Sequence, residues 1–225
     1  MRTALLLALS CASLCASQAI ETAILAKMDQ AGPAFSGMTA NMARTTYTAV
    51  IKESDKESGT IRLKRIGPKE VQVLIDFTEP DRKMVAFHGS KAQVYYPKIK
   101  TVEEYQVGKE ERGLVDEFLR LGFGSTGKEL KQSYTINSAV KDIVAGRQTT
   151  LLSLVPKTAK VKEKFPELDL WVSDETGEPV QQKLVEPSGN YYLIGYTDMK
   201  LNPVFAAGDL EMKLPKDVVR RYPQK

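Results

Sequence analysis

The stretch from Glu70 to Lys98 constrains the fold most strongly, because it contains three runs of strand-forming residues separated by two turns. Side chains on a strand point to opposite faces with period two. Four apolar side chains therefore share one face of the first run: Val71, Val73, Ile75 and Phe77. Gln72 and Asp76 share the other face, where Leu74 is an exception. Since a sheet with one apolar face has to cover it, other parts of the chain must pack there.

Most of the remaining chain has the same antiparallel character. Polar turns separate further strand-like segments, at residues 35–52, 59–66, 140–156, 168–172, 180–185, 191–196 and 202–214. No alternation of strand and helix appears, which argues against a parallel sheet. We therefore predict an α+β fold that is mainly antiparallel β.

The apolar period changes to that of a helix in two places, Ile20–Gln30 and Glu110–Leu121. Gly32-Pro33 is expected to stop the first helix. Thr126 and Glu129 form the pattern of a capping box, which predicts a further short helix from Gly127 to about Tyr134. These helices are the candidates for covering the apolar face.

The first nineteen residues have the pattern of a secretory signal peptide. They combine a basic start at Arg2, an apolar run from Ala4 to Leu9 and a small-x-small site at Ser17-Gln18-Ala19. The run is shorter than the roughly 20 residues that a spanning helix needs. We therefore expect export to the periplasm and one mature domain, residues 20–225.

Both cysteines, Cys11 and Cys15, lie within this leading segment. Cleavage after Ala19 leaves a chain without disulfides, which its core alone must hold together. The alternative is a lipoprotein that is lipidated at Cys11 or Cys15. Intact-mass measurement of the mature protein distinguishes the two.

Charge offers little support for a nucleic-acid partner. The formal net charge is +4 and falls to about +3 when Arg2 leaves with the signal peptide. Basic residues are spread along the chain, and Lys98–Lys100 and Lys157–Lys164 are only small clusters. A basic stripe is therefore missing.

No motif predicts catalysis, a metal or a cofactor. Gly122–Glu129 nearly fits the phosphate-binding pattern G-x-x-x-x-G-K-[ST], but Glu129 stands where a hydroxyl is required, and the loop follows a helix instead of a strand. The single histidine, His88, lies beside a turn without a nucleophile motif. We therefore expect a binding protein and not an enzyme. The hydrolase alternative would be supported only if the fold placed His88 next to a serine and a carboxylate. Apolar area suits an acyl chain.

Arg65 is the unusual polar residue of the pattern. It shares a strand face with Ile61 and Leu63, so it points toward the apolar side unless a bulge turns it to solvent. An arginine on an apolar side needs hydrogen-bond acceptors.

The order of short motifs along most of the mature chain resembles the LolA family of periplasmic lipoprotein carriers. The motifs are Phe35-Ser36-Gly37, Gly59-Thr60-Ile61-Arg62-Leu63-Lys64-Arg65, Phe77-Thr78-Glu79-Pro80, Val85-Ala86-Phe87, Gly89-Ser90-Lys91, Val94-Tyr95-Tyr96-Pro97, Leu168-Asp169-Leu170-Trp171-Val172, Asn202-Pro203 and Leu214-Pro215. One departure is Ile66, where the family usually has proline.

The resemblance implies an unclosed half β-barrel with helices covering its concave face. It also implies a monomeric carrier that takes acylated lipoproteins from an inner-membrane ABC transporter complex to an outer-membrane receptor. Arg65 matches the family arginine that latches the helical lid, and Leu25 or Met28 is its expected contact. The expected ligand cavity is lined by Ile24, Val71, Val73, Ile75, Phe77, Tyr95, Leu114 and Phe118.

Two alternatives use the same fold. One is a lipid-binding envelope lipoprotein, which requires that Cys11 or Cys15 is retained. The other is an envelope-stress sensor domain, which we expect to carry a second domain or a membrane segment. The chain has neither after its leader, so the sequence favours the carrier.

Overall fold

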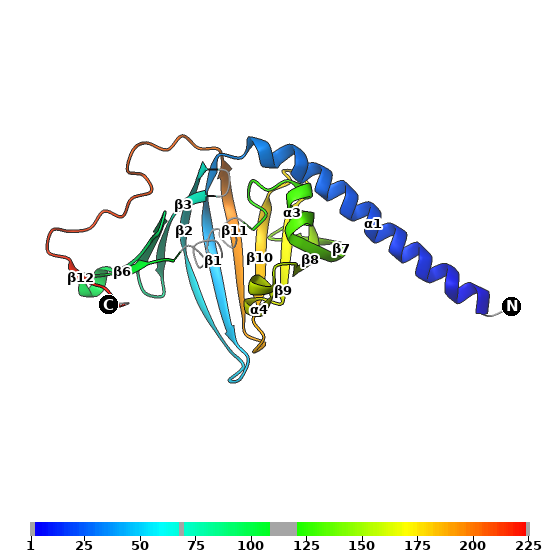
Figure 1. The fold of residues 1–225 in the computed structure, drawn as a ribbon, viewed down its shortest axis with the longest axis horizontal. Helices are drawn as coiled ribbons and strands as arrows, with labels where there is room; N and C mark the ends of the chain where they lie inside the picture. Colours follow the sequence, from blue (N-terminus) through cyan, green and yellow to red (C-terminus); the bar gives the residue numbers. More distant parts are fainter. Residues whose placement is uncertain (1–2, 68–69, 109–120, 224–225) are drawn as a thin grey trace. The chain divides into compact units, whose positions relative to one another are not determined.

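The computed structural model describes residues 3–67, 70–108 and 121–223. The chain divides into two compact units. Unit 1 combines residues 1–34 with 122–191, and unit 2 combines residues 35–121 with 192–225. Figure 1 shows the elements of both.

Strands make up most of the described part of unit 2. They hydrogen-bond in the order β12-β6-β5-β4-β3-β2-β1-β11. Pairing is antiparallel from β1 through β6, whereas β12 lies parallel to β6. A short 3-10 turn, η1, joins β5 to β6. The bounds are β1 (Gly37–Thr48), β2 (Glu53–Gly67), β3 (Glu70–Glu79), β4 (Lys83–His88), β5 (Lys91–Tyr96), η1 (Pro97–Ile99), β6 (Thr101–Gln106), β11 (Tyr191–Leu201) and β12 (Val219–Arg221).

The alternation predicted for the first run, Val71 to Phe77, is confirmed, with Leu74 as the expected exception. Cross-strand partners such as Leu63 and Val73 lie on the same side of the sheet, and we call this side face A. Its side chains are 0–8% exposed, and burial of each Met, Ile, Leu, Val or Phe side chain contributes about 1.5–3 kcal/mol. They are Met38, Ala40 and Met42 of β1, Ile61 and Leu63 of β2, and Val71, Val73, Ile75 and Phe77 of β3.

The opposite side, face B, explains the exceptional Leu74. This residue is 3% exposed and packs with Ala86 and with Leu210 from the segment that follows β11. We call residues 202–213 the C-terminal strap. Its prediction as a strand is wrong, because Asn202 and Gly208 have positive φ angles that break an extended chain. Figure 1 shows the strap as an irregular trace between β11 and β12.

Unit 1 contains four strands in the order β10-β9-β8-β7 among the residues described. The pairings of β7 with β8, β8 with β9 and β9 with β10 are antiparallel. Helices α1 and α3 pack on β7, and α4 packs on β8. The bounds are α1 (Thr3–Ala34), α3 (Gly127–Ser133), β7 (Tyr134–Val144), β8 (Arg147–Pro156), α4 (Ala159–Lys164), β9 (Glu167–Ser173) and β10 (Pro179–Val185).

Helix α3 begins where the sequence predicts. The Thr126 hydroxyl accepts a hydrogen bond from Glu129 N at 3.1 Å, and the Glu129 carboxylate accepts one from Thr126 N at 2.9 Å. This reciprocal pair is the capping box.

Helix α1 differs from its prediction, because it continues through Gly32-Pro33 to Ala34. Pro33 lies in the last turn, so the hydrogen bond that it removes is one near the helix end. Gly32 is required by packing: an added Cβ would lie 2.8 Å from the Ser125 backbone. The same holds for Gly127, whose added Cβ would lie 2.7 Å from Leu25. Helix α1 therefore packs backbone against backbone within unit 1.

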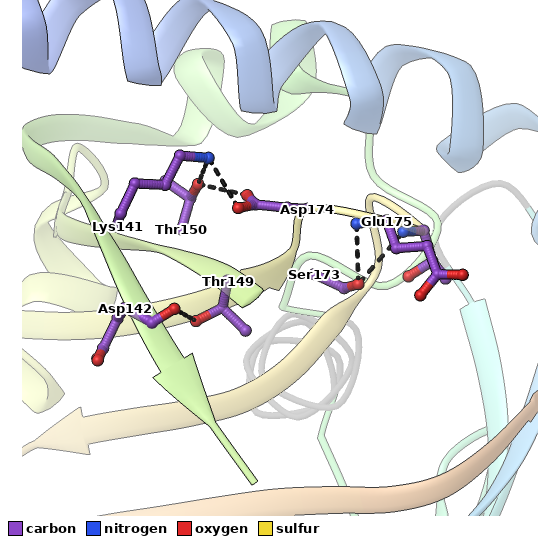
Figure 2. Close-up of polar contacts among 8 residues, drawn as sticks. Lys141, Asp142, Thr149, Thr150, Ser173, Asp174 and Glu175 are labelled. Carbon is purple, nitrogen blue, oxygen red and sulfur yellow. Dashed lines mark hydrogen bonds and ion pairs between the residues drawn. The ribbon is translucent and has the colours of Figure 1, made fainter. Parts of the chain in front are cut away.

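A polar network stabilises the β7–β8–β9 end of unit 1. Figure 2 shows Lys141, Thr150 and Asp174 pointing toward one another. Lys141 Nζ donates to the Asp174 carboxylate at 2.8 Å and to Thr150 Oγ1 at 3.0 Å, while Thr150 Oγ1 donates to Asp174 at 2.7 Å. Burial raises the pKa of Asp174, but the hydrogen bonds from Lys141 and Thr150 outweigh it and lower that pKa.

We expect unit 1 to lose stability in acid through Asp174. Because its pKa is lowered in the folded state, the unfolded chain binds more protons, so the contribution is present above about pH 4 and is lost as pH falls below it. The size is at most about 1 kcal/mol, since the pair is partly exposed. Urea unfolding between pH 7 and 3 measures it. Asp174→Asn should flatten the curve, and an unchanged slope would contradict the assignment.

The predicted fold class is confirmed. The sheet is mainly antiparallel and in neither unit does it close on itself. Among the described residues, no helix has the length and apolar character needed to cross a membrane. The signal peptide and the single mature domain stay predictions.

Candidate functional site

Face A holds four of the residues predicted to line a cavity. Val71, Val73, Ile75 and Phe77 are 3%, 0%, 8% and 1% exposed. A ligand can reach these side chains only by displacing the atoms that cover them. Their role as a cavity floor stays a prediction.

Tyr95 does not share this face. It is the cross-strand partner of Met84, which pairs with Asp76, and these residues belong to face B. Tyr95 therefore lies on the side of the sheet opposite to Phe77, because β4 and β5 keep their register without a bulge between them. Its role in ligand binding stays a prediction. Leu114 and Phe118 lie outside the described residues.

Three charged side chains, Arg44, Glu57 and Lys83, lie where the apolar part of face A ends. The Glu57 carboxylate accepts a hydrogen bond from Arg44 Nη2 on one oxygen and from Lys83 Nζ on the other. Arg44 is in phase with Met42 along β1, so its guanidinium lies on the apolar side of the strand. We call these three residues the charged cluster.

Phe77 lies beneath the charged cluster. Its ring centroid is 5.0 Å from the Arg44 guanidinium carbon and 5.1 Å from Lys83 Nζ, within the range of cation–π attraction. Burial raises the pKa of Glu57, but hydrogen bonds from Lys83 and Arg44 and their positive charges lower it overall. The carboxylate is therefore held ionised between two cations.

Arg65 lies elsewhere along the same face. Its backbone N donates to Ser36 O at 2.9 Å, and its guanidinium carbon is 5.7 Å from the centroid of the Phe35 ring. Ser36 is fixed in turn by Asn202 Oδ1, which accepts from Ser36 N at 2.7 Å. The side chain is half-buried, which supports the inward orientation.

The two expected lid contacts, Leu25 and Met28, and the predicted cavity residue Ile24 belong to α1 of unit 1. Ile24, Leu25 and Met28 are 2%, 8% and 0% exposed. Leu25 also lines a shallow cavity of about 650 Å³ between α1 and α3. Whether Leu25 or Met28 contacts Arg65 stays a prediction.

A second cavity, of about 560 Å³, lies on face B beneath the C-terminal strap. Leu74 and Met84 line it from the sheet and Phe205 from the strap. Arg62 Nη1 donates to Asp209 O at 3.1 Å at this cavity. It is separate from face A, so it is not the predicted cavity.

The charged cluster was missed by the sequence prediction. The available signal was strand phase: Arg44 continues the alternation of Met38, Ala40 and Met42. The same reasoning singles out Arg65 on β2. Glu57 and Lys83 give no such signal alone, because their positions depend on the β1–β2 and β3–β4 pairings.

No model of a known protein family matches the sequence, and no curated protein matches it. Solved structures do match. MucB is 16% identical with a TM-score of 0.50, over 87% of this chain and 63% of MucB. An uncharacterized conserved protein from Thermus thermophilus is 11% identical with a TM-score of 0.50, over 88% of this chain and 97% of that protein. The likeness is one of fold.

A LolA superfamily protein from Nitrosomonas europaea also matches, at 15% identity and a TM-score of 0.38, over 82% of this chain and 94% of that one. The chain spans less than two thirds of MucB.

Proposed function

We propose that this protein binds the acyl chains of lipoproteins or other lipids in the periplasm and carries them from the inner to the outer membrane. The observation that supports the proposal is face A, an apolar surface that ends in the charged cluster and carries Arg65. A core that only holds a fold together gains little from half-buried arginines, because each carries a desolvation cost. An amphiphilic ligand uses both the apolar area and the charges.

The composition of face A suits chains of variable shape. Met38 and Met42 belong to it, 0% and 4% exposed, and methionine adapts to irregular apolar partners. An acyl chain gains free energy in proportion to the apolar area removed from water. We propose that an inner-membrane ABC transporter complex donates the lipoprotein or lipid to this protein, and that an outer-membrane protein receives it.

Native mass spectrometry of the protein purified from its own envelope tests the proposal directly. We expect complexes whose extra mass is that of a lipid or an acylated lipoprotein. A dansyl-labelled fatty acid should also gain fluorescence on binding to the delipidated protein. If neither a co-purified lipid nor probe binding is found, the proposal fails.

If Arg65 is the latch, Arg65→Leu should accelerate exchange of a bound acyl probe by about tenfold, because it removes the proposed latch contact, worth roughly 1–2 kcal/mol. Stopped-flow displacement of the dansyl probe measures the rate. Arg147→Leu, the same substitution at an exposed position of unit 1, is the control. Equal exchange rates in Arg65→Leu and the unsubstituted protein would exclude the latch.

A further inference from the structure

We propose that the charged cluster of Arg44, Glu57 and Lys83 is a subsite for the anionic headgroup of a lipid whose acyl chain lies on face A. The ligand class is therefore a fatty-acid carboxylate or an alkyl phosphate, preferred over a neutral lipid. This inference rests on the proposed function and specifies the ligand of the same face.

The position of the cluster suits a headgroup. On β1 the apolar series ends at Met42, which is 4% exposed, and the next side chain on face A is Arg44, which is 31% exposed. Glu57 and Lys83 are 18% and 23% exposed. From Met42 to Arg44, two positions along β1, the face thus changes from buried apolar side chains to charged side chains that solvent reaches. A bound amphiphile changes in the same way from its tail to its headgroup.

The cluster has more donors than acceptors. Two cations share one carboxylate, and each oxygen of Glu57 already accepts from one of them. Nε of Arg44 is buried and, within the described part of the chain, makes no hydrogen bond. Lys83 has three ammonium hydrogens, of which one is directed at Glu57. An incoming anion would satisfy these donors and neutralise the excess positive charge.

Phe77 fixes the cations next to the apolar surface. Both lie about 5 Å from its ring centroid, so a headgroup bound to them places the first methylenes of its chain against Phe77. Asp55, the next acidic residue of β2 on this side, is exposed, where solvent screens its charge. The cluster therefore keeps its positive character at the point where the apolar floor begins.

The test compares dansyl-labelled undecanoic acid with its methyl ester, which differ only in charge at the head. We expect the acid to bind about tenfold more tightly, as charge-assisted hydrogen bonds are typically worth. Arg44→Met and Lys83→Met should each weaken the acid about tenfold and leave the ester unchanged. Dodecanoate and dodecyl phosphate, used as competitors, identify whether a carboxylate or a phosphate is preferred.

Glu57→Gln is the most informative variant, because it should strengthen binding of the acid, whereas Arg44→Met and Lys83→Met should weaken it. It raises the cluster charge by one, so the acid should bind several-fold more tightly. A loss of folding cannot produce this gain. Lys56→Met, on the neighbouring residue that is exposed, removes the same charge as Lys83→Met and should change neither affinity.

The outcomes separate the two proposals. Equal binding of acid and ester, or an equal loss of both in Arg44→Met, overturns the headgroup subsite and leaves acyl binding intact. Tighter acid binding that reverses in Arg44→Met and increases in Glu57→Gln supports it. If neither probe binds the unsubstituted protein, the proposed function itself fails.

Discussion

Gly59→Ala should lower the free energy of unfolding by about 3 kcal/mol. Gly59 faces Phe77 across β2 and β3, next to the irregular pairing at Ser58. An added Cβ would lie 2.0 Å from Asp76 O and 2.7 Å from Phe77 Cα. Both are backbone atoms, so β3 itself has to move. Urea unfolding followed by far-UV circular dichroism measures the effect.

Gly67→Ala is the matched control for Gly59→Ala. Gly67 is in the same strand, but an added Cβ there would lie 3.4 Å from Glu70 Cβ, which is ordinary contact. We expect a change below about 0.5 kcal/mol. Because Gly59→Ala displaces Phe77, it should also weaken the acid probe beyond any effect of Gly67→Ala. Equal stabilities of the two variants would contradict the close approach of β3.

Met28→Ala is expected to lower the stability of unit 1 by about 2–4 kcal/mol. Met28 is 0% exposed on α1, a helix tied to α3 by the contact of Leu25 with Gly127. Trp171, the one tryptophan of the chain, is in unit 1 and reports its unfolding by fluorescence. Truncation of a buried side chain leaves a cavity that a tightly packed region fills only in part.

The result also distinguishes a fixed helix from a loosely held cover. Gln30→Ala, at an exposed position of the same helix, is the control and should change stability by less than about 0.5 kcal/mol. If Met28→Ala lowered the stability as little as Gln30→Ala, α1 would be held weakly enough to act as a cover that opens readily. A large effect means that any opening has to occur without breaking the packing of Met28.

Local patterns in the sequence predicted the elements that are governed by local chemistry. The capping box at Thr126 determines where α3 begins, and alternation determines which β3 side chains are buried. The C-terminal strap was predicted wrongly because Phe205 and Leu210 bury themselves on face B from an irregular backbone. Apolar spacing cannot distinguish that arrangement from a strand.

The candidate site was predicted only in part. Arg65 and the apolar series of β3 follow from strand phase, whereas the face of Tyr95 depends on the register across β4 and β5, which the sequence does not give. The charged cluster unites residues from β1, β2 and β4. Such a cluster arises from the pairing between strands, so it cannot be predicted from the sequence of any single strand.

The placement of α1 determines the order in which the protein can assemble. Asp29 accepts a hydrogen bond from the backbone N of Lys128, a residue 99 positions later. At a synthesis rate of roughly 10 residues per second, the apolar side of α1 waits about 10 s for its partners. During that interval Ile24, Leu25 and Met28 lack the partners that bury them, which makes the emerging chain a ready client for chaperones.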